Sequence, residues 1–219
     1  ELYACSLQNR MPQRSLTRSF ESYIHWLNSK DRTEAETFWR TYLAKVTEPT
    51  RLPIEKGTLH DVHQPIENQQ IETLIIDARR TKQIADFVQQ AQVSLNTLVQ
   101  FAWGKVLQVY HDADTTIFGM VVSGRGSDLA KADRITGMLI NTLPLVMHWN
   151  VEQTITEYVQ QLHQTIQKIN DHSYVSLSEL RSWSGIQGHA MFYSIVAFEN
   201  YLNDYRQPAH ELKMSAVQE

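Results

Sequence analysis

The sequence predicts an α/β fold of the layered α+β type, in which helices cover a sheet. Several segments have apolar residues every three or four positions, the pattern of helices with one buried face. Two others, Thr115–Ser123 and Leu143–Trp149, are rich in β-branched and aromatic residues, as strands are. Because the predicted helices and strands alternate along the chain, they should stack in layers around a common core.

The first part of the chain is predicted to be helical. Glu1–Leu7 already has a helical pattern, and a second helix is expected over Leu16–Asn28. Thr33 is the expected N-cap of a third helix. The apolar stripes of the second and third helices are Leu16, Phe20, Tyr23, Ile24 and Leu27, and then Ala35, Phe38, Trp39, Tyr42 and Leu43.

The middle of the chain continues the alternation. A polar connection rich in proline over 49–65 leads to a strand predicted over Gln70–Ile76. Asp77 is the expected N-cap of a helix that runs through Gln92, and Ser94 that of the next helix. The second of these helices should lie against a sheet through an apolar face that comprises Leu95, Leu98, Val99, Ala102, Val106, Val109 and Tyr110.

The last third predicts two helices and a strand after Leu143–Trp149. A long helix should begin at Thr154, with its apolar face formed by Ile155, Tyr158, Val159, Leu162, Ile166 and Ile169. A short helix over Ser176–Trp183 and a strand over Phe192–Phe198 should follow.

Composition narrows the class of protein. The 219 residues are 42% hydrophobic and 20% charged with a net charge of -4, and Lys and Arg do not cluster, so we expect neither a nucleic-acid partner nor a membrane surface. No apolar run reaches the length of a bilayer span. The single cysteine, Cys5, excludes an internal disulfide and a cysteine-based metal site, so we expect a reducing, cytoplasmic location.

Three candidate sites lack the residue spacing that a metal site, a hydrolase nucleophile or a phosphate loop needs. His60, Asp61 and His63 lie in a proline-flanked loop without the helical spacing or the distant third ligand of a zinc site, so we expect no metal. Ser123 stands in Ser-Gly-Arg-Gly and not in the Gly-x-Ser-x-Gly turn of hydrolases. The nearby glycines are not followed by the Lys-Ser or Lys-Thr of a phosphate loop, so no nucleotide is expected.

A family resemblance rests on four landmarks in order. Val122-Ser123-Gly124-Arg125 and Thr136–Pro144, which reads TGMLINTLP, resemble the Ser-Gly-Arg and Gly-x-Phe-x-Asn-Thr-Leu-Pro signatures of nonribosomal peptide synthetase condensation domains. Phe20–Trp26 resembles the Tyr-x-Asp-Tyr-x-x-Trp helix of that family. His172–Leu180 and Phe192–Tyr201 resemble its segments before and within a late strand.

The departures from the family pattern matter as much as the matches. Ser22 replaces the usual Asp, Met138 the usual Phe, and Val146 an Arg that often follows the Asn-Thr-Leu-Pro segment. The His-His-x-x-x-Asp-Gly motif with the catalytic histidine of the family is not in this sequence, and the resemblance places it upstream. We therefore expect a fragment in which residues 1–30 are a helical segment that ends the preceding lobe, residues 31–219 are a C-terminal lobe truncated at its end, and no catalytic residue is present.

The resemblance implies a fold and an activity. The fold would be the C-terminal lobe of the chloramphenicol acetyltransferase type, a mixed sheet flanked by helices, with a substrate tunnel between two lobes. The intact domain would form an amide bond between a carrier-bound acyl or peptidyl thioester and an aminoacyl acceptor. The implied partners are carrier proteins with their phosphopantetheine arms, an adjacent adenylation domain and the missing N-terminal lobe. Two alternatives stay open: a starter-type domain that acylates the first amino acid, and a non-catalytic lobe that recruits a carrier or a tailoring protein.

The resemblance also suggests roles for individual residues. Asn141, Ser123 and Thr142 would line the tunnel, although Asn141 could instead bind only neighbouring backbone. Structural roles are expected for a second set, which comprises Arg125, Gly124, Gly137, Tyr23 and Trp26.

Overall fold

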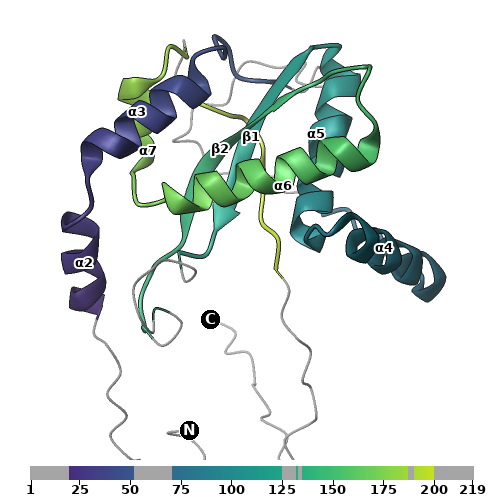
Figure 1. Ribbon diagram of the computed structural model, residues 1–219, viewed down its shortest axis with the longest axis horizontal. Helices are drawn as coiled ribbons and strands as arrows, with labels where there is room; N and C mark the ends of the chain where they lie inside the picture. Colours follow the sequence, from purple (N-terminus) through teal and green to yellow (C-terminus); the bar gives the residue numbers. More distant parts are fainter. Residues whose placement is uncertain (1–19, 52–70, 125–131, 133–134, 187–189, 200–219) are drawn as a thin grey trace, which may run out of the picture.

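The computed structural model describes residues 20–51, 71–124, 132, 135–186 and 190–199. Along the described chain four helices come first, followed by two strands, two helices and a last strand (Figure 1). They are α2 (Phe20–Asn28), α3 (Arg32–Leu43), α4 (Ala78–Ala91), α5 (Leu95–His111), β1 (Thr115–Val122), β2 (Asn141–His148), α6 (Ile155–Asp171), α7 (Leu177–Trp183) and β3 (Ile195–Val196). The helix expected over Glu1–Leu7 and the His60–His63 loop lie outside the described residues.

The three strands form a mixed sheet in the order β2-β1-β3. β1 and β2 are antiparallel, with a register that runs from Thr115 opposite His148 to Val122 opposite Asn141. β3 lies parallel to β1, with Ile195 opposite Gly119. The mixed sheet is confirmed, but β3 is shorter than the predicted Phe192–Phe198, and β2 begins two residues earlier than predicted.

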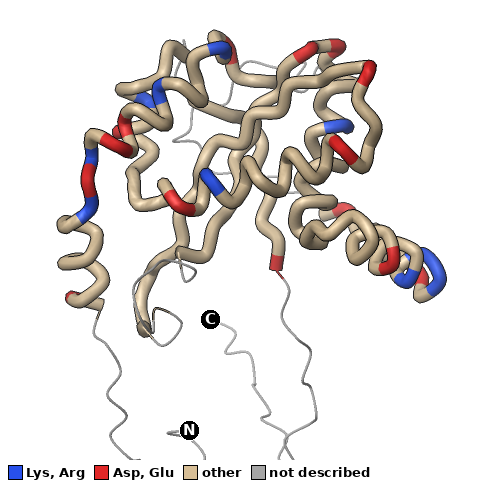
Figure 2. Tube along the Cα trace, in the orientation of Figure 1, with Lys and Arg blue, Asp and Glu red and all other residues tan. Residues whose placement is uncertain are grey.

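The core lies between the sheet and the helices around it. α5 and α6 contact each other and the sheet, whereas α3 packs with α7 at the opposite end (Figure 1). Neither β1 nor β2 carries a charged residue, and charges of both signs lie on the helices and loops around them (Figure 2). The largest fully buried side chains include Trp39, Leu43, Leu107, Phe118, Met120, Leu143, Leu145, Met147 and Ile169.

Side-chain caps fix where most helices begin. Asp77, Ser94, Thr154 and Ser176 each accept a hydrogen bond from a backbone N–H in the first turn of the helix that follows. The caps at Asp77 and Ser94 were predicted, and for Thr154 and Ser176 the sequence predicted only that a helix begins there. The prediction for α3 was wrong by two residues. Its N-cap is Asp31, whose carboxylate accepts from the Thr33 N–H at 2.8 Å, so Thr33 lies inside the helix.

The strand predicted over Gln70–Ile76 is not formed in the described residues 71–76. Ile71, Leu74 and Ile75 are more than 80% exposed, and the segment has no regular structure. A strand needs a neighbour to bond its backbone groups. The described sheet contains only β1, β2 and β3, so the sequence pattern has no partner here.

The orientation predicted for α5 was also wrong. Its buried face comprises Thr97, Gln100, Gly104 and Leu107, and most of the predicted apolar face points outward. Gly104 explains the close approach to the sheet, because a Cβ there would lie 2.1 Å from the Met147 sulfur. The helix therefore buries small and polar residues together with Leu107, whereas Val99, Val106 and Val109 lie on the outside.

No helix among the described residues has both the length and the apolar character that a bilayer crossing would need.

Tyr42 protects the outer edge of β2. Its hydroxyl accepts from the Val146 N–H at 2.8 Å and lies 3.3 Å from the Val146 carbonyl, to which it donates. Burial raises the pKa of Tyr42 well above its usual value, which keeps this hydroxyl protonated. The phenol thus replaces the neighbouring strand that the sheet lacks on this side.

We predict that Tyr42→Phe destabilises the protein by about 1–3 kcal/mol, because both backbone groups of Val146 lose their partner in a buried place. Urea unfolding with an unchanged m-value measures this loss. Tyr110→Phe, on a half-exposed ring of α5, is the matched control and should change the midpoint little. Equal midpoints for Tyr42→Phe and the parent would contradict the role of the hydroxyl.

Candidate functional site

Landmarks that are far apart in the sequence meet at the end of the β1–β2 pair where β1 ends and β2 begins. Val122 pairs with Asn141, so Ser123, which follows β1, lies beside the first residues of β2. Ser123 is exposed, and Asn141 and Thr142 are half-buried. The turn between α6 and α7 reaches the same corner through hydrogen bonds to Asn141. The hairpin end, this turn and α2 together form what we call the hairpin corner.

Gly124 joins the two sides of the hairpin corner. Its φ of +64° lies in the left-handed region that favours glycine. A Cβ on Gly124 would lie 2.1 Å from the Leu139 carbonyl oxygen, so no other residue fits without moving the backbone. The structural role expected for Gly124 has a physical basis here, whereas Arg125 lies outside the described residues.

Leu139 anchors the segment that leads into β2. It is buried with Ala132 and Ile135 in a small cluster, against which Tyr23 and Trp26 of α2 pack. Gly137 lies under the Phe20 ring, because a Cβ there would be 2.3 Å from Phe20 Cδ2. These contacts make Tyr23, Trp26 and Gly137 packing residues.

Met138 and Ile140, on either side of Leu139, are 81% and 64% exposed. The anchored segment therefore presents two apolar side chains to solvent next to Ser123 and Thr142. The hairpin corner thus combines polar hydrogen-bonding groups with an apolar surface.

The Asn141 side chain is engaged with backbone. Its Nδ2 donates to the carbonyls of Ser173 at 3.0 Å and Val175 at 2.7 Å, and its Oδ1 accepts from the Thr142 N–H at 2.8 Å. Both amide protons are used, which is the backbone-binding alternative that the sequence left open. A place for Asn141 on a tunnel wall stays a prediction.

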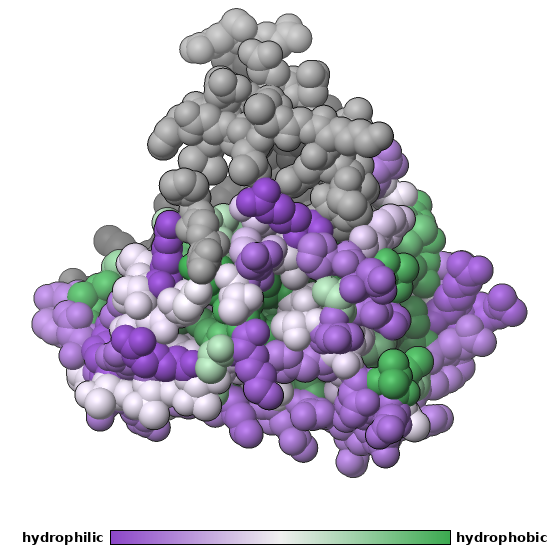
Figure 3. All heavy atoms as spheres, turned by 90° about the horizontal axis from the view of Figure 1, so that it is seen from above, coloured by the Kyte–Doolittle hydropathy of each residue, from purple (hydrophilic) through white to green (hydrophobic). Residues whose placement is uncertain are grey.

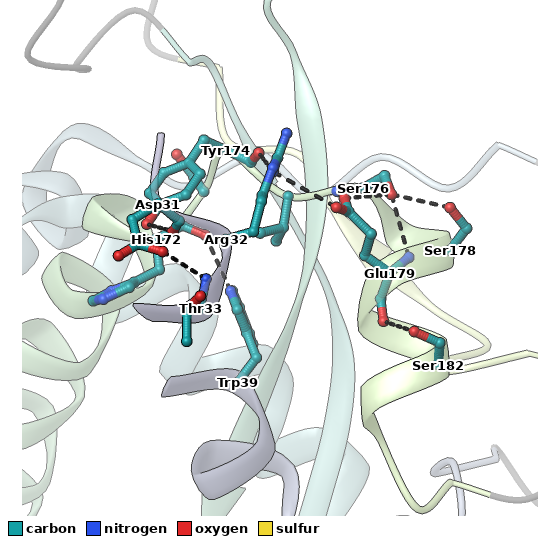
Figure 4. Close-up of polar contacts among 12 residues, drawn as sticks. Asp31, Arg32, Thr33, Trp39, His172, Tyr174, Ser176, Ser178, Glu179 and Ser182 are labelled. Carbon is teal, nitrogen blue, oxygen red and sulfur yellow. Dashed lines mark hydrogen bonds and ion pairs between the residues drawn. The ribbon is translucent and has the colours of Figure 1, made fainter. Parts of the chain in front are cut away.

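Side chains from other elements hold four consecutive carbonyls of the turn between α6 and α7. Trp39 Nε1 donates to His172 at 3.0 Å, and the Arg32 guanidinium donates to Tyr174 (Figure 4). Asn141 binds the two others, those of Ser173 and Val175. Three side chains from α3 and β2 therefore bind the backbone of this turn.

Glu179 completes this arrangement at the start of α7. Its carboxylate accepts from the N–H and the hydroxyl of Ser176, each at 2.7 Å, and lies 3.7 Å from Arg32 (Figure 4). Burial by itself would raise the pKa of Glu179. The Ser176 hydrogen bonds and the Arg32 charge outweigh it, so this pKa is lower than usual.

His172 acts as a packing group in this corner. Its ring stacks on Phe38 with centroids 4.1 Å apart, and its Nδ1 lies 2.8 Å from the Lys168 carbonyl, which can only accept. The proton is therefore on Nδ1, where it is already donated. The described residues hold no group of three His, Cys, Asp or Glu side chains placed to bind a metal ion.

Sequence reasoning missed Arg32, Trp39 and Glu179. Arg32 and Trp39 are seven positions apart, two helical turns, so the spacing alone puts them on one face of α3. The Ser-x-x-Glu pattern of Ser176 and Glu179 is the sequence signature of a capping box. Both patterns are in the sequence, but neither predicts that Arg32 and Trp39 donate to the carbonyls of Tyr174 and His172.

Comparison with known proteins gives the family. A family model described as the condensation domain matches residues 1–218. This chain belongs to the condensation domain family. One of the proteins that make up linear gramicidin synthase in Brevibacillus parabrevis is 32% identical over the whole chain, which spans 3% of that protein. Gramicidin S synthase 2 of Brevibacillus brevis is 29% identical over 90% of the chain, which spans 4% of that protein.

Solved structures agree on the fold. The first condensation domain of the calcium-dependent antibiotic synthetase, in complex with a substrate analogue, matches with a TM-score of 0.70 at 14% identity, over 93% of this chain and 43% of that one. The X-domain from teicoplanin biosynthesis matches with a TM-score of 0.68 at 21% identity, over 88% of this chain and 45% of that one. It has also been solved in complex with OxyB. The fold is of the chloramphenicol acetyltransferase type, as expected.

We predict that Asn141→Ala destabilises the chain by about 1–3 kcal/mol, because the carbonyls of Ser173 and Val175 lose their donor. Asn141→Asp should cost more at pH 7, since a carboxylate of the same shape would face two carbonyl oxygens. Urea unfolding measures both, with Asn150→Ala in an exposed turn as the control. An Asp variant as stable as the parent would show that the amide does not hold the turn.

The lowered pKa of Glu179 predicts a pH dependence of stability. A carboxyl whose pKa is lower in the folded state contributes stability above its unfolded pKa, and this is lost as the pH falls through the folded pKa. Glu179→Gln should therefore be less stable than the parent at pH 7, with a difference that shrinks below about pH 4.5. Urea midpoints at pH 7 and pH 3 test this, with Glu152→Gln as the control. A difference independent of pH would contradict it.

Proposed function

We propose that this chain forms part of a condensation domain that joins a carrier-bound acyl or peptidyl thioester to the amine of an aminoacyl acceptor. The family match over residues 1–218 is the observation that carries the proposal. The hairpin corner supports it, because three of the segments that resemble the family signatures meet there with α2, although they are far apart in the sequence.

The reaction needs an oriented amine, help with its deprotonation and stabilisation of a tetrahedral oxyanion. In our proposal this chain supplies orientation. Ser123 and Thr142 would face the substrate arms on a tunnel wall, and Asn141, through the turn that it holds, would fix the position of Thr142. The catalytic histidine would come from the part of the domain upstream of this chain.

Partners follow from the same proposal. The phosphopantetheine arms of two carrier proteins would deliver donor and acceptor, and an adenylation domain would lie adjacent in the synthetase. Residues 1–30 would end the N-terminal lobe and 31–219 would belong to the C-terminal lobe. α2 would then sit at the boundary, since Tyr23 and Trp26 contact the segment before β2. We place the synthetase in the cytoplasm, in line with its single cysteine.

The proposal predicts that the intact domain forms the amide with carrier-loaded substrates and that this chain alone does not. Ser123→Ala and Thr142→Val in the intact domain should each lower kcat/KM about 2- to 12-fold, the loss of one hydrogen bond of about 0.5–1.5 kcal/mol. Thr41→Val, on an exposed turn of α3, is the matched control. Turnover by this chain alone, or unchanged rates in both variants, would contradict the assignment.

A second candidate is a lobe that recruits a tailoring protein, favoured by the structural match to the X-domain that was solved with OxyB. Recovery of the upstream sequence separates the two candidates. An intact His-His-x-x-x-Asp-Gly motif with turnover supports the enzyme, whereas a broken motif and no turnover support recruitment. A starter-type domain would be recognised by its preference for fatty acyl donors in the same assay.

A further inference from the structure

Side chains alternate between two faces along the segment that leads into β2. Met138 is 81% exposed, Leu139 is 2% exposed and Ile140 is 64% exposed, which is the alternation of an extended strand. Leu139 and Asn141 therefore point inward, toward buried side chains and backbone. Met138, Ile140 and Thr142 share the outward face.

The end of β1 adds to the same face. Thr142 lies opposite Val121, and the same register continued by one residue brings Ser123 opposite Ile140. Residues that lie directly opposite each other on neighbouring strands share one face of a sheet. This face therefore combines two hydroxyls with three apolar side chains and no charge, and we call these five residues the outward row: Val121, Ser123, Met138, Ile140 and Thr142.

The backbone that carries the outward row is closely packed at both ends. Gly124 approaches the Leu139 carbonyl so closely that a Cβ would lie 2.1 Å from its oxygen. Two residues before Val121, a Cβ on Gly119 would lie 2.6 Å from the Phe192 ring. The row therefore begins where the cover of Phe192 ends, and its side chains are positioned before any ligand binds.

The mixture of groups in the outward row is typical of a small-molecule site, in which apolar walls surround a few polar groups that fix orientation. The end of the molecule away from the hairpin corner presents mostly hydrophilic side chains (Figure 3). The hairpin corner instead exposes Met138 and Ile140 beside two hydroxyls. A methionine side chain is flexible and polarisable, so it packs against apolar groups of different shapes.

We infer that Met138 and Ile140 contact the apolar side chain of a carrier-bound substrate and set the preference of the condensation domain for such substrates. The inference rests on the proposed function, in which Ser123 and Thr142 face the substrate arms. The reacting end of the substrate is polar, so the hydroxyls bind that end while the apolar members of the row bind the side chain. The competing occupant is the part of the domain outside this chain, which would cover Met138 and Ile140 without any contact to substrate.

Selectivity of the intact condensation domain tests the inference. Leucine and asparagine have side chains of similar size and different polarity, so the ratio of their kcat/KM values measures the preference for an apolar side chain. One arm of the experiment varies the residue on the acceptor carrier, and the other varies it on the donor carrier. Met138→Gln should lower the ratio about tenfold in one of the arms, which is the lower end of what one apolar group contributes to selectivity. A residue that only supports the fold would lower both rates alike and leave the ratio unchanged.

Three further variants make the test specific. Ile140→Gln should lower the ratio in the same arm as Met138→Gln. Met138→Leu, which stays apolar and similar in volume, should keep the ratio close to that of the parent. Val151→Gln changes a fully exposed apolar residue in the turn before α6 and is the matched control. Ratios that stay unchanged in both arms for Met138→Gln and Ile140→Gln would overturn the inference.

A binding measurement separates the inference from the proposed activity. The probe is leucyl-pantetheine amide, an unreactive analogue of the thioester, added to the intact domain with isotope-labelled methionine methyl groups. Met138→Leu identifies the methyl NMR signal of Met138, which should shift with this probe and not with the asparaginyl analogue. A shift without turnover refutes only the proposed activity, and turnover without a shift refutes only the contact.

Discussion

The hairpin corner depends on one set of contacts, in which side chains bind the four consecutive carbonyls of the turn between α6 and α7. Trp39, Arg32 and Asn141 donate to the carbonyls from His172 to Val175. Because these donors come from α3 and β2, the shape of the turn depends on where that helix and that strand lie. The positions of the exposed residues of the hairpin corner therefore depend on these hydrogen bonds.

The sheet shows the same reliance on side chains where strands are missing. On one outer edge the Tyr42 hydroxyl takes the place of a strand by binding both backbone groups of Val146. On the other edge β3 has no such substitute among the described residues, and α5 turns apolar residues toward it. One edge is therefore closed by a side chain of the chain itself, and the other has no partner strand among the described residues.

Local patterns predicted the elements well but not their surroundings. Caps at Asp77, Ser94, Thr154 and Ser176 follow from chemistry within one helical turn, so the sequence contains them in full. The burial of a face depends on a neighbour, and there the predictions for 71–76 and α5 were wrong. An apolar stripe shows that a face is to be covered, but it does not show whether the cover lies in the same part of the chain.

The candidate site was predictable as a set of residues and not as a set of contacts. The motif residues Ser123, Gly124 and Asn141 do meet, but the amide of Asn141 serves the backbone and not an open cavity. A residue that holds a turn can belong to a signature segment as well as one that touches substrate, because it positions the groups around it. Its presence in a signature segment therefore does not distinguish the two roles. The contacts of Asn141 with Ser173 and Val175 favour the positioning role, and in our proposal direct contact with the substrate arms falls to the exposed Ser123 and the half-buried Thr142.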